Sequence, residues 1–91
     1  MGSQERITWE KAAEGHFQTI LKQIPDLVRG IAETRINKKA ESIVKADKRL
    51  IITEKDMVHA FFAETPAAFM GPMKSSMENL GIDYKKYGFS I

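Results

Sequence analysis

Two histidines, His16 and His59, and the carboxylates near them are the residues of this sequence most suited to metal or acid–base chemistry. His59 follows Asp56 by three residues, which is the spacing of one half of a carboxylate–histidine metal site on a helix. A complete site needs further ligands, and His16 is the only other histidine. We therefore expect no metal, and we expect His59 to be exposed or held by a local contact.

The composition excludes several classes of active site. The 91 residues include no cysteine, which rules out a disulfide framework, a thiolate nucleophile and a cysteine-ligated zinc ion or iron–sulfur cluster. No Ser–His–Asp pattern, P-loop or dinucleotide fingerprint occurs in the sequence. The sequence therefore predicts no bound cofactor and no independent enzyme.

The hydropathy pattern predicts a protein that does not enter the membrane. No apolar run approaches the roughly 18 residues needed to cross a bilayer. The first nine residues, MGSQERITW, lack the apolar region of a signal peptide. A chain without cysteine is also compatible with a reducing compartment. We expect a cytoplasmic location.

The elements that must position these residues are predicted to be helices. Apolar residues between Trp9 and Ile24 recur at spacings of three and four, which indicates one face of a helix over residues 8–23. Thr8 is the expected N-cap of that helix. Gly15 inside it costs about 1 kcal/mol relative to alanine, so we expect a close packing contact there.

A second, longer helix is predicted over residues 25–46. Pro25 cannot continue the first helix and suits the first turn of a new one. Its apolar residues are predicted to form one broad stripe against the core: Leu27, Val28, Ile31, Ala32, Ile36, Ala40, Ile43 and Val44. A polar turn follows at residues 47–49, and residues 50–52 are expected to be extended.

The third helix is predicted over residues 54–64. Thr53 is its expected N-cap, and Asp56 three residues later gives a shortened capping box. Thr65 and Pro66 end the helix.

A short fourth helix is predicted over residues 72–80, opened by Gly71-Pro72 and capped by Gly81. The expected fold is therefore all-α, with a compact three-helix core. A flexible N-terminus (residues 1–7) precedes this core domain (residues 8–64), and a C-terminal helical extension and tail (residues 65–91) follow it.

Three stretches resemble a known family when taken in order: Trp9, the segment LKQIPDLVRGIA at residues 21–32, and ITEKD at residues 52–56. They are similar to the small C-terminal domain of the B subunit of light-independent (dark-operative) protochlorophyllide reductase, which also occurs as short stand-alone proteins. The residues that carry this motif are Trp9, Ile24, Pro25, Val28, Arg29, Gly30, Ile52 and Thr53.

The resemblance covers about residues 9–63 and implies a three-helix fold in a nitrogenase-like or tetrapyrrole context. The catalytic body of the reductase subunit, with its cluster and pigment cavity, has no counterpart in this sequence. Residues 66–91 are an extension without a place in the family pattern. The resemblance thus implies an accessory module and does not imply that this chain reduces a substrate.

Arg29 is the motif residue most open to a functional interpretation. It lies in the first turn of the second predicted helix, where a cation opposes the helix dipole. One interpretation is a contact with an anion or a partner. The other, which we favour, is an ion pair with Asp26 or Glu33 on an exposed face.

Positive charge gathers between residues 35 and 49, where six cations stand against two carboxylates and give a net charge of +4. Residues 50–83 carry a net charge of −3. The candidate contact surface comprises Arg35, Lys38, Lys39, Lys45, Lys48 and Arg49. This stripe, on a long helix reminiscent of the histone fold, suits the phosphates of nucleic acid. A solvated helix face is the simpler interpretation.

Methionines and phenylalanines cluster between residues 57 and 77. Met73, Met77 and Leu80 recur at helical spacing and form a candidate apolar docking surface for a partner helix or a flat ligand. The alternative, which we favour, is that the fourth helix folds back and these residues complete the core.

Two functions from different classes follow from these observations. The first is a non-catalytic accessory module that contacts a protein partner or a hydrophobic ligand. The second is a small histone-like DNA-binding protein that uses the basic face of the second helix. A homo-oligomer whose exposed apolar patch is covered by its own symmetry mate is a further possibility.

Overall fold

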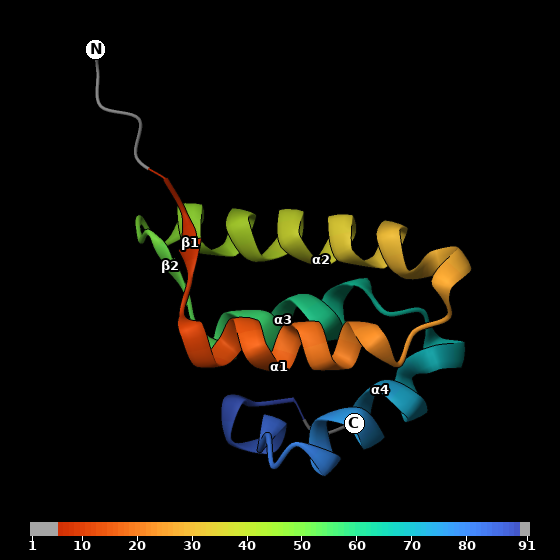
Figure 1. The fold of residues 1–91 in the computed structure, drawn as a ribbon. Coiled ribbons are helices and arrows are strands. Elements are labelled where there is room, and N and C mark those ends of the chain that lie inside the picture. Colours follow the sequence, from red (N-terminus) through yellow and green to blue (C-terminus); the bar gives the residue numbers. More distant parts are fainter. Residues whose placement is uncertain (1–5, 90–91) are drawn as a thin grey trace.

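The structure is a computed structural model, and it describes residues 6–89. Its helices are α1 (Lys11–Lys22), α2 (Asp26–Ala46), α3 (Glu54–Glu64) and α4 (Met70–Asn79). Two short strands, β1 (Thr8–Trp9) and β2 (Ile51–Ile52), and two 3₁₀ turns, η1 (Ala67–Phe69) and η2 (Tyr84–Tyr87), complete the described chain (Figure 1). The predicted all-α fold is confirmed. The flexible N-terminus predicted for residues 1–7 falls mostly outside the described residues.

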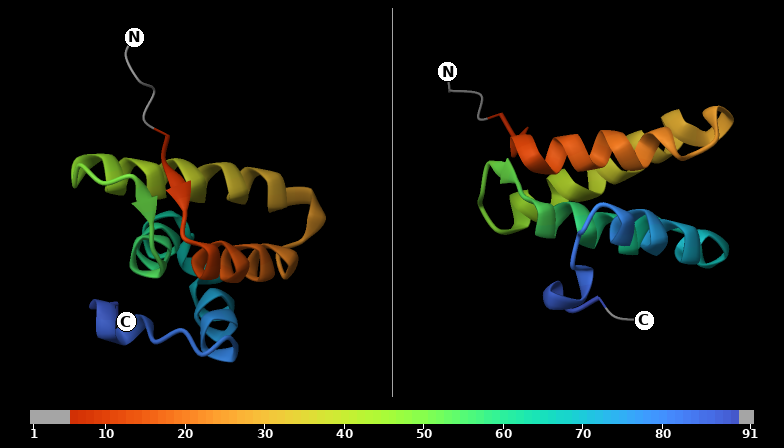
Figure 2. Two further views of the ribbon diagram at one scale, coloured as in Figure 1. Left: turned by 60° about the vertical axis from the view of Figure 1, so that its left-hand side comes forward. Right: turned by 60° about the horizontal axis from the view of Figure 1, so that its bottom comes forward.

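Helix α2 is the longest element, and α3 packs along it (Figures 1 and 2). Helix α1 lies against both, and α4 with the C-terminal tail covers the side of α1 and α3 that faces away from α2. The two strands pair in parallel, with backbone amides of Thr8 and Glu10 donating to the carbonyls of Leu50 and Ile52 at 2.9 Å. This pairing ties the start of α1 to the segment between α2 and α3.

One hydrophobic cluster runs through all four helices. Its largest fully buried side chains are Phe17, Leu21, Val44, Ile52, Met57, Val58 and Met77. The C-terminal residues Ile82 and Tyr84 belong to the same cluster. The extension after residue 64 is therefore built into the core of the molecule.

The helix boundaries differ from the prediction at two places. Thr8 is not an N-cap: it pairs in β1, and α1 begins at Lys11 with Glu10 in the N-cap position. The strand forms because the β-branched segment at residues 51–52 offers hydrogen-bond partners that the sequence pattern of α1 does not reveal. Helix α4 begins at Met70, two residues before the predicted start, and Pro72 is accommodated in its first turn.

The C-terminal cap predicted at Gly81 is confirmed. Gly81 has a φ of +74°, a left-handed conformation that glycine adopts at low cost. Its amide donates to the carbonyl of Glu78 at 3.0 Å, and the amide of Ile82 donates to that of Met77 at 2.9 Å. Ile82 and Met77 are both buried, so this Schellman motif also directs the tail back onto the core.

The single apolar stripe predicted along α2 is wrong. Ile36, Ala40 and Val44 are buried, whereas Leu27, Val28 and Ile31 are exposed. At 100° per residue, Leu27 lies roughly 180° around the helix from Ile36, and Ile31 roughly 140°. The first turns of α2 thus carry apolar residues on the side away from the core.

The close packing contact predicted at Gly15 is also wrong. Among the described residues, no side chain or neighbouring element lies within 4 Å of the position that a Cβ would occupy there. Gly15 is exposed on α1, so its cost in helix stability has no packing reason in the folded chain.

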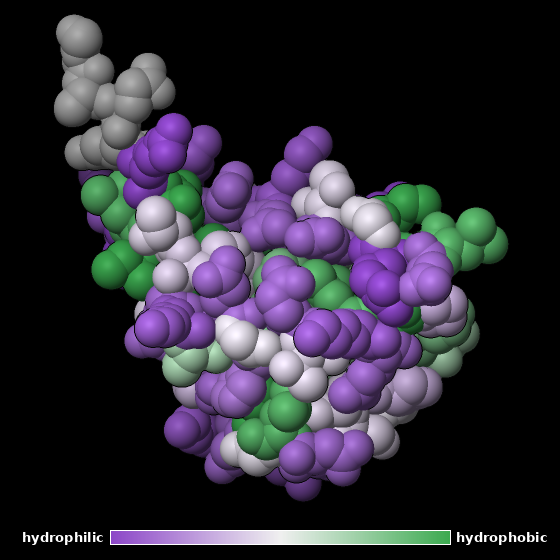
Figure 3. Space-filling view, in the orientation of Figure 1, coloured by the Kyte–Doolittle hydropathy of each residue, from purple (hydrophilic) through white to green (hydrophobic). Residues whose placement is uncertain are grey.

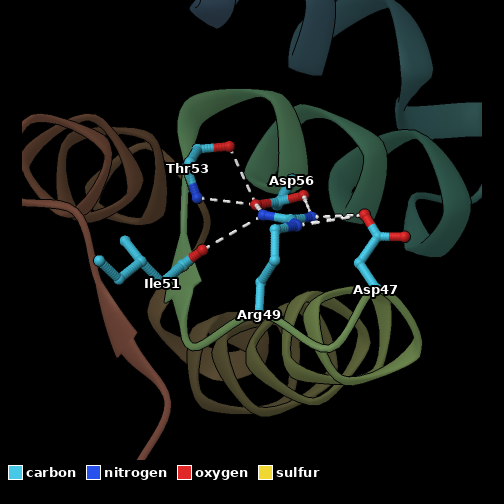
Figure 4. Close-up of polar contacts among 5 residues, drawn as sticks. All are labelled: Asp47, Arg49, Ile51, Thr53 and Asp56. Atoms are coloured by element: carbon cyan, nitrogen blue, oxygen red, sulfur yellow. Dashed lines mark hydrogen bonds and ion pairs between the residues drawn. The ribbon is translucent and has the colours of Figure 1, made fainter.

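A buried carboxylate fixes the connection between α2 and α3 (Figure 4). Asp56 is only 3% exposed, and its two oxygens accept hydrogen bonds from Arg49 Nη1 at 2.9 Å and Nη2 at 2.8 Å. The backbone amide of Thr53 donates to the same carboxylate at 2.8 Å. Asp47 lies on the outer side of the guanidinium, 2.9 Å from Nη2. The predicted capping box of α3 is therefore present, with Arg49 added to it.

These contacts change the pKa of Asp56. Burial alone raises the pKa of this carboxyl, but hydrogen bonds from Arg49 and Thr53 outweigh burial and hold the pKa below its usual value. A carboxyl with a lowered pKa in the folded state stabilises the fold above its unfolded pKa, near pH 4. That contribution is lost as the pH falls through the lower folded-state pKa.

Replacing Asp56 with Asn should therefore lower the free energy of unfolding by about 1.5–3 kcal/mol at pH 7, because two charge-assisted hydrogen bonds are weakened. Urea denaturation at pH 7, 5 and 3 measures the effect. The difference between the wild type and Asp56→Asn should shrink as the pH falls below about 4. The exposed Glu41→Gln change on α2 is the matched control, expected within about 0.5 kcal/mol. A constant difference at all three pH values would contradict this account.

Candidate functional site

In the described chain, the large aliphatic side chains with the highest exposed fractions lie in the first turns of α2. Leu27 is 91% exposed and Ile31 is 58% exposed. They are four residues apart, so they lie one above the other on the same side of the helix. In the space-filling view, hydrophobic side chains stand out at the end of the molecule where α2 begins (Figure 3). Large aliphatic side chains exposed together mark a contact surface more often than single ones do.

Small residues accompany these aliphatic side chains. Gly30 and Thr34 lie on the same side, and the Thr34 hydroxyl donates to the Gly30 carbonyl at 3.0 Å. This bond satisfies the hydroxyl proton within the helix. A shallow depression over Gly30 is lined by both apolar and charged side chains. We call the surface formed by Leu27, Gly30, Ile31, Thr34, Arg35 and Lys38 the outer face of α2.

Charges of opposite sign stand at the two ends of the outer face. Asp26, at the N-terminal end, has a side chain that is 89% exposed. Arg35 and Lys38, at the other end, are both exposed. The outer face is thus an apolar strip with an acidic end and a basic end.

The predicted basic surface is only partly available. Arg35, Lys38, Lys45 and Lys48 are exposed, and Lys39 is half-buried. Arg49 differs from the others, because its guanidinium binds Asp47 and Asp56 and also donates to the carbonyl of Ile51 at 3.4 Å. Arg49 is therefore engaged in the fold, and the free positive charge comes from the remaining five residues.

Lys48 has an unusual backbone conformation. Its φ is +58°, and it occupies the left-handed position after the C-terminus of α2 that glycine usually fills. The amides of Lys48 and Arg49 close a Schellman motif onto the carbonyls of Lys45 and Val44. This motif aims Arg49 back toward Asp56 and leaves the Lys48 side chain in solvent.

The apolar docking surface predicted on α4 lies in the core. Met73 and Met77 are buried, and Leu80 is half-buried against them. The reason is the turn at Gly81, which folds Ile82 and Tyr84 over the same side of α4. These methionines complete the core, which is the alternative that the sequence favoured.

The histidines have local roles. His16 Nδ1 lies 3.2 Å from Glu54 Oε1, and the Tyr87 hydroxyl donates to the other oxygen of Glu54 at 3.1 Å. His59 is exposed, with its ring 5.5 Å from that of Phe89. Among residues 6–89, no three His, Cys, Asp or Glu side chains come together in a way that could hold a metal ion.

Arg29 joins α1 to α2. Its Nε donates to the carbonyl of Leu21 at 2.8 Å, and its Nη2 donates to the carbonyls of Ile24 at 2.9 Å and Lys22 at 3.2 Å. Nη1 pairs with Asp26 at 2.7 Å. The pair with Asp26 is the contact favoured from the sequence.

These contacts with carbonyls explain why Arg29 is stable near the N-terminus of α2, where the dipole of that helix opposes a positive charge. The last carbonyls of a helix lack partners within the helix and carry partial negative charge. Arg29 sits at the C-terminal end of α1, where that charge attracts it. The sequence pattern could not show this, because the favourable dipole belongs to the preceding helix.

Most of the other residues on which the sequence resemblance was based also have structural roles. The Trp9 ring stacks on Phe17 at 4.5 Å, and its indole nitrogen donates to Asn37 at 2.8 Å. Pro25 occupies the N-cap of α2, Ile52 is buried, and Thr53 occupies the N-cap of α3. Ile24 is half-buried at the corner between α1 and α2. Val28 and Gly30 are exposed and lie at or beside the outer face.

A comparison with protein families identifies the family to which the chain belongs. A family model described as "Protein of unknown function (DUF2621)" matches residues 3–90. The chain belongs to this DUF2621 family. No curated protein and no solved structure matches it. The match spans both the three-helix part and the C-terminal extension, in agreement with the single hydrophobic core. Within the described part of this DUF2621 chain, no helix has the length and apolarity needed to span a membrane.

Replacing Arg29 with Ala should destabilise the protein by about 1.5–3 kcal/mol, because the α1 carbonyls lose charged donors. Thermal unfolding followed by circular dichroism measures this change. Arg29→Lys should recover only part of the stability, since an ammonium group cannot reproduce the planar array of donors. Arg35→Ala, an exposed arginine two turns later, is the control and should change stability by at most about 0.5 kcal/mol. Equal effects of Arg29→Ala and Arg35→Ala would contradict the capping role.

Proposed function

We propose that this chain is a non-catalytic binding module that contacts a protein partner through the outer face of α2. The observation that carries the proposal is the exposure of Leu27 and Ile31 on the side of α2 opposite the core. An aliphatic side chain gains about 1.5–3 kcal/mol when it is fully buried. Covering both residues would therefore contribute several kcal/mol to binding.

The shape of the surface favours a helical partner over a small ligand. Pockets for small molecules are concave and enclose most of the ligand, whereas the outer face is a shallow strip along one helix. An amphipathic helix binds such a strip with apolar residues spaced by three and four. Arg35 and Lys38 would favour acidic residues at one end of that partner helix.

The resemblance to the C-terminal domain of the protochlorophyllide reductase B subunit supports the same class of function. It points to an accessory domain, and the motif residues at the corner of α1 and α2 are those that orient the outer face. A cytoplasmic location, which we also propose, is compatible with a chain that contains no cysteine.

The proposal is tested with the double variant Leu27→Ser/Ile31→Ser as bait in extracts of the source cells. A partner recovered with the wild type and then purified should bind the double variant roughly 100-fold more weakly, because about 3 kcal/mol of apolar contact is lost. Leu50→Ser/Ile51→Ser is the matched control, since those side chains are also exposed but lie at the other end of the molecule. Equal affinity of both double variants for the purified partner would overturn the proposal.

A second candidate function is nucleic-acid binding by the basic residues of α2 and the following turn. Lys38, Lys45 and Lys48 are exposed, and Lys48 occupies a left-handed position where glycine would cost less. Contact between the Lys48 charge and a phosphate would give a reason for a lysine at this strained position. The histone-like interpretation of the sequence rests on the same residues.

Fluorescence anisotropy with a short DNA duplex tests this second candidate. If three or four phosphates are neutralised, the logarithm of the binding constant should fall with the logarithm of salt concentration with a slope of about −3. The variant Lys38→Gln/Lys45→Gln/Lys48→Gln should remove most of that slope. Lys11→Gln/Lys22→Gln/Lys85→Gln carries the same change in net charge at exposed positions elsewhere and is the control. Absence of salt-sensitive binding at micromolar protein would rule the candidate out.

A further inference from the structure

We draw no further inference here: the strongest candidate, the exposed apolar surface of Leu27 and Ile31 on the first turns of α2, belongs to the outer face already described, and nothing among residues 6–89 shows what covers it.

Discussion

The buried carboxylate of Asp56 is the constraint on which the arrangement of the helices depends. An ionised carboxylate that is 3% exposed requires charged and polar partners, and Arg49 and Thr53 supply them. Arg49 reaches Asp56 only because α2 ends in a Schellman motif with Lys48 in the left-handed conformation. The end of α2, the extended segment at residues 51–52 and the start of α3 are thereby fixed together. β1 pairs with that segment and places the start of α1.

A second arginine fixes the opposite end of the same long helix. Arg29, in the first turn of α2, binds the carbonyls at the end of α1. Arg29 thus donates to carbonyls that lack partners at the end of α1, and Arg49 donates to a carboxylate that is buried away from water. Because α2 is held at both ends, its buried side, with Ile36, Ala40 and Val44, is set against α1 and α3. The opposite side is left to solvent, and this exposes Leu27 and Ile31.

The outer face of α2 is therefore a consequence of how the helix is oriented. Core helices carry apolar residues on one side, and α2 does so from Ile36 onward. Its first turns depart from that pattern, with aliphatic residues toward solvent, an acidic residue before them and basic residues after them. The proposed binding role derives from this departure.

The sequence by itself determined the helices, since periodicity, Pro25, Thr53 and Gly81 mark where they run and end through local interactions alone. It also determined the absence of cysteine chemistry and the gathering of positive charge after residue 35. Only the tertiary structure decided which side of α2 is buried, because apolar residues occur on both sides and the wheel positions of Leu27 and Ile36 differ by half a turn. A helical wheel of the whole of α2 separates Leu27 from Ile36, but it does not show which of the two sides faces the core.

Only the tertiary structure likewise decided that Arg29 binds the carbonyls at the end of α1 and that Arg49 binds Asp56 of α3. The same holds for the burial of Met73 and Met77 in the core. Each of these outcomes depends on a contact between segments that are distant in space until the chain folds. Local sequence patterns record the preferences of one segment. They do not record the carbonyl, the carboxylate or the turn that a neighbouring segment will bring to it.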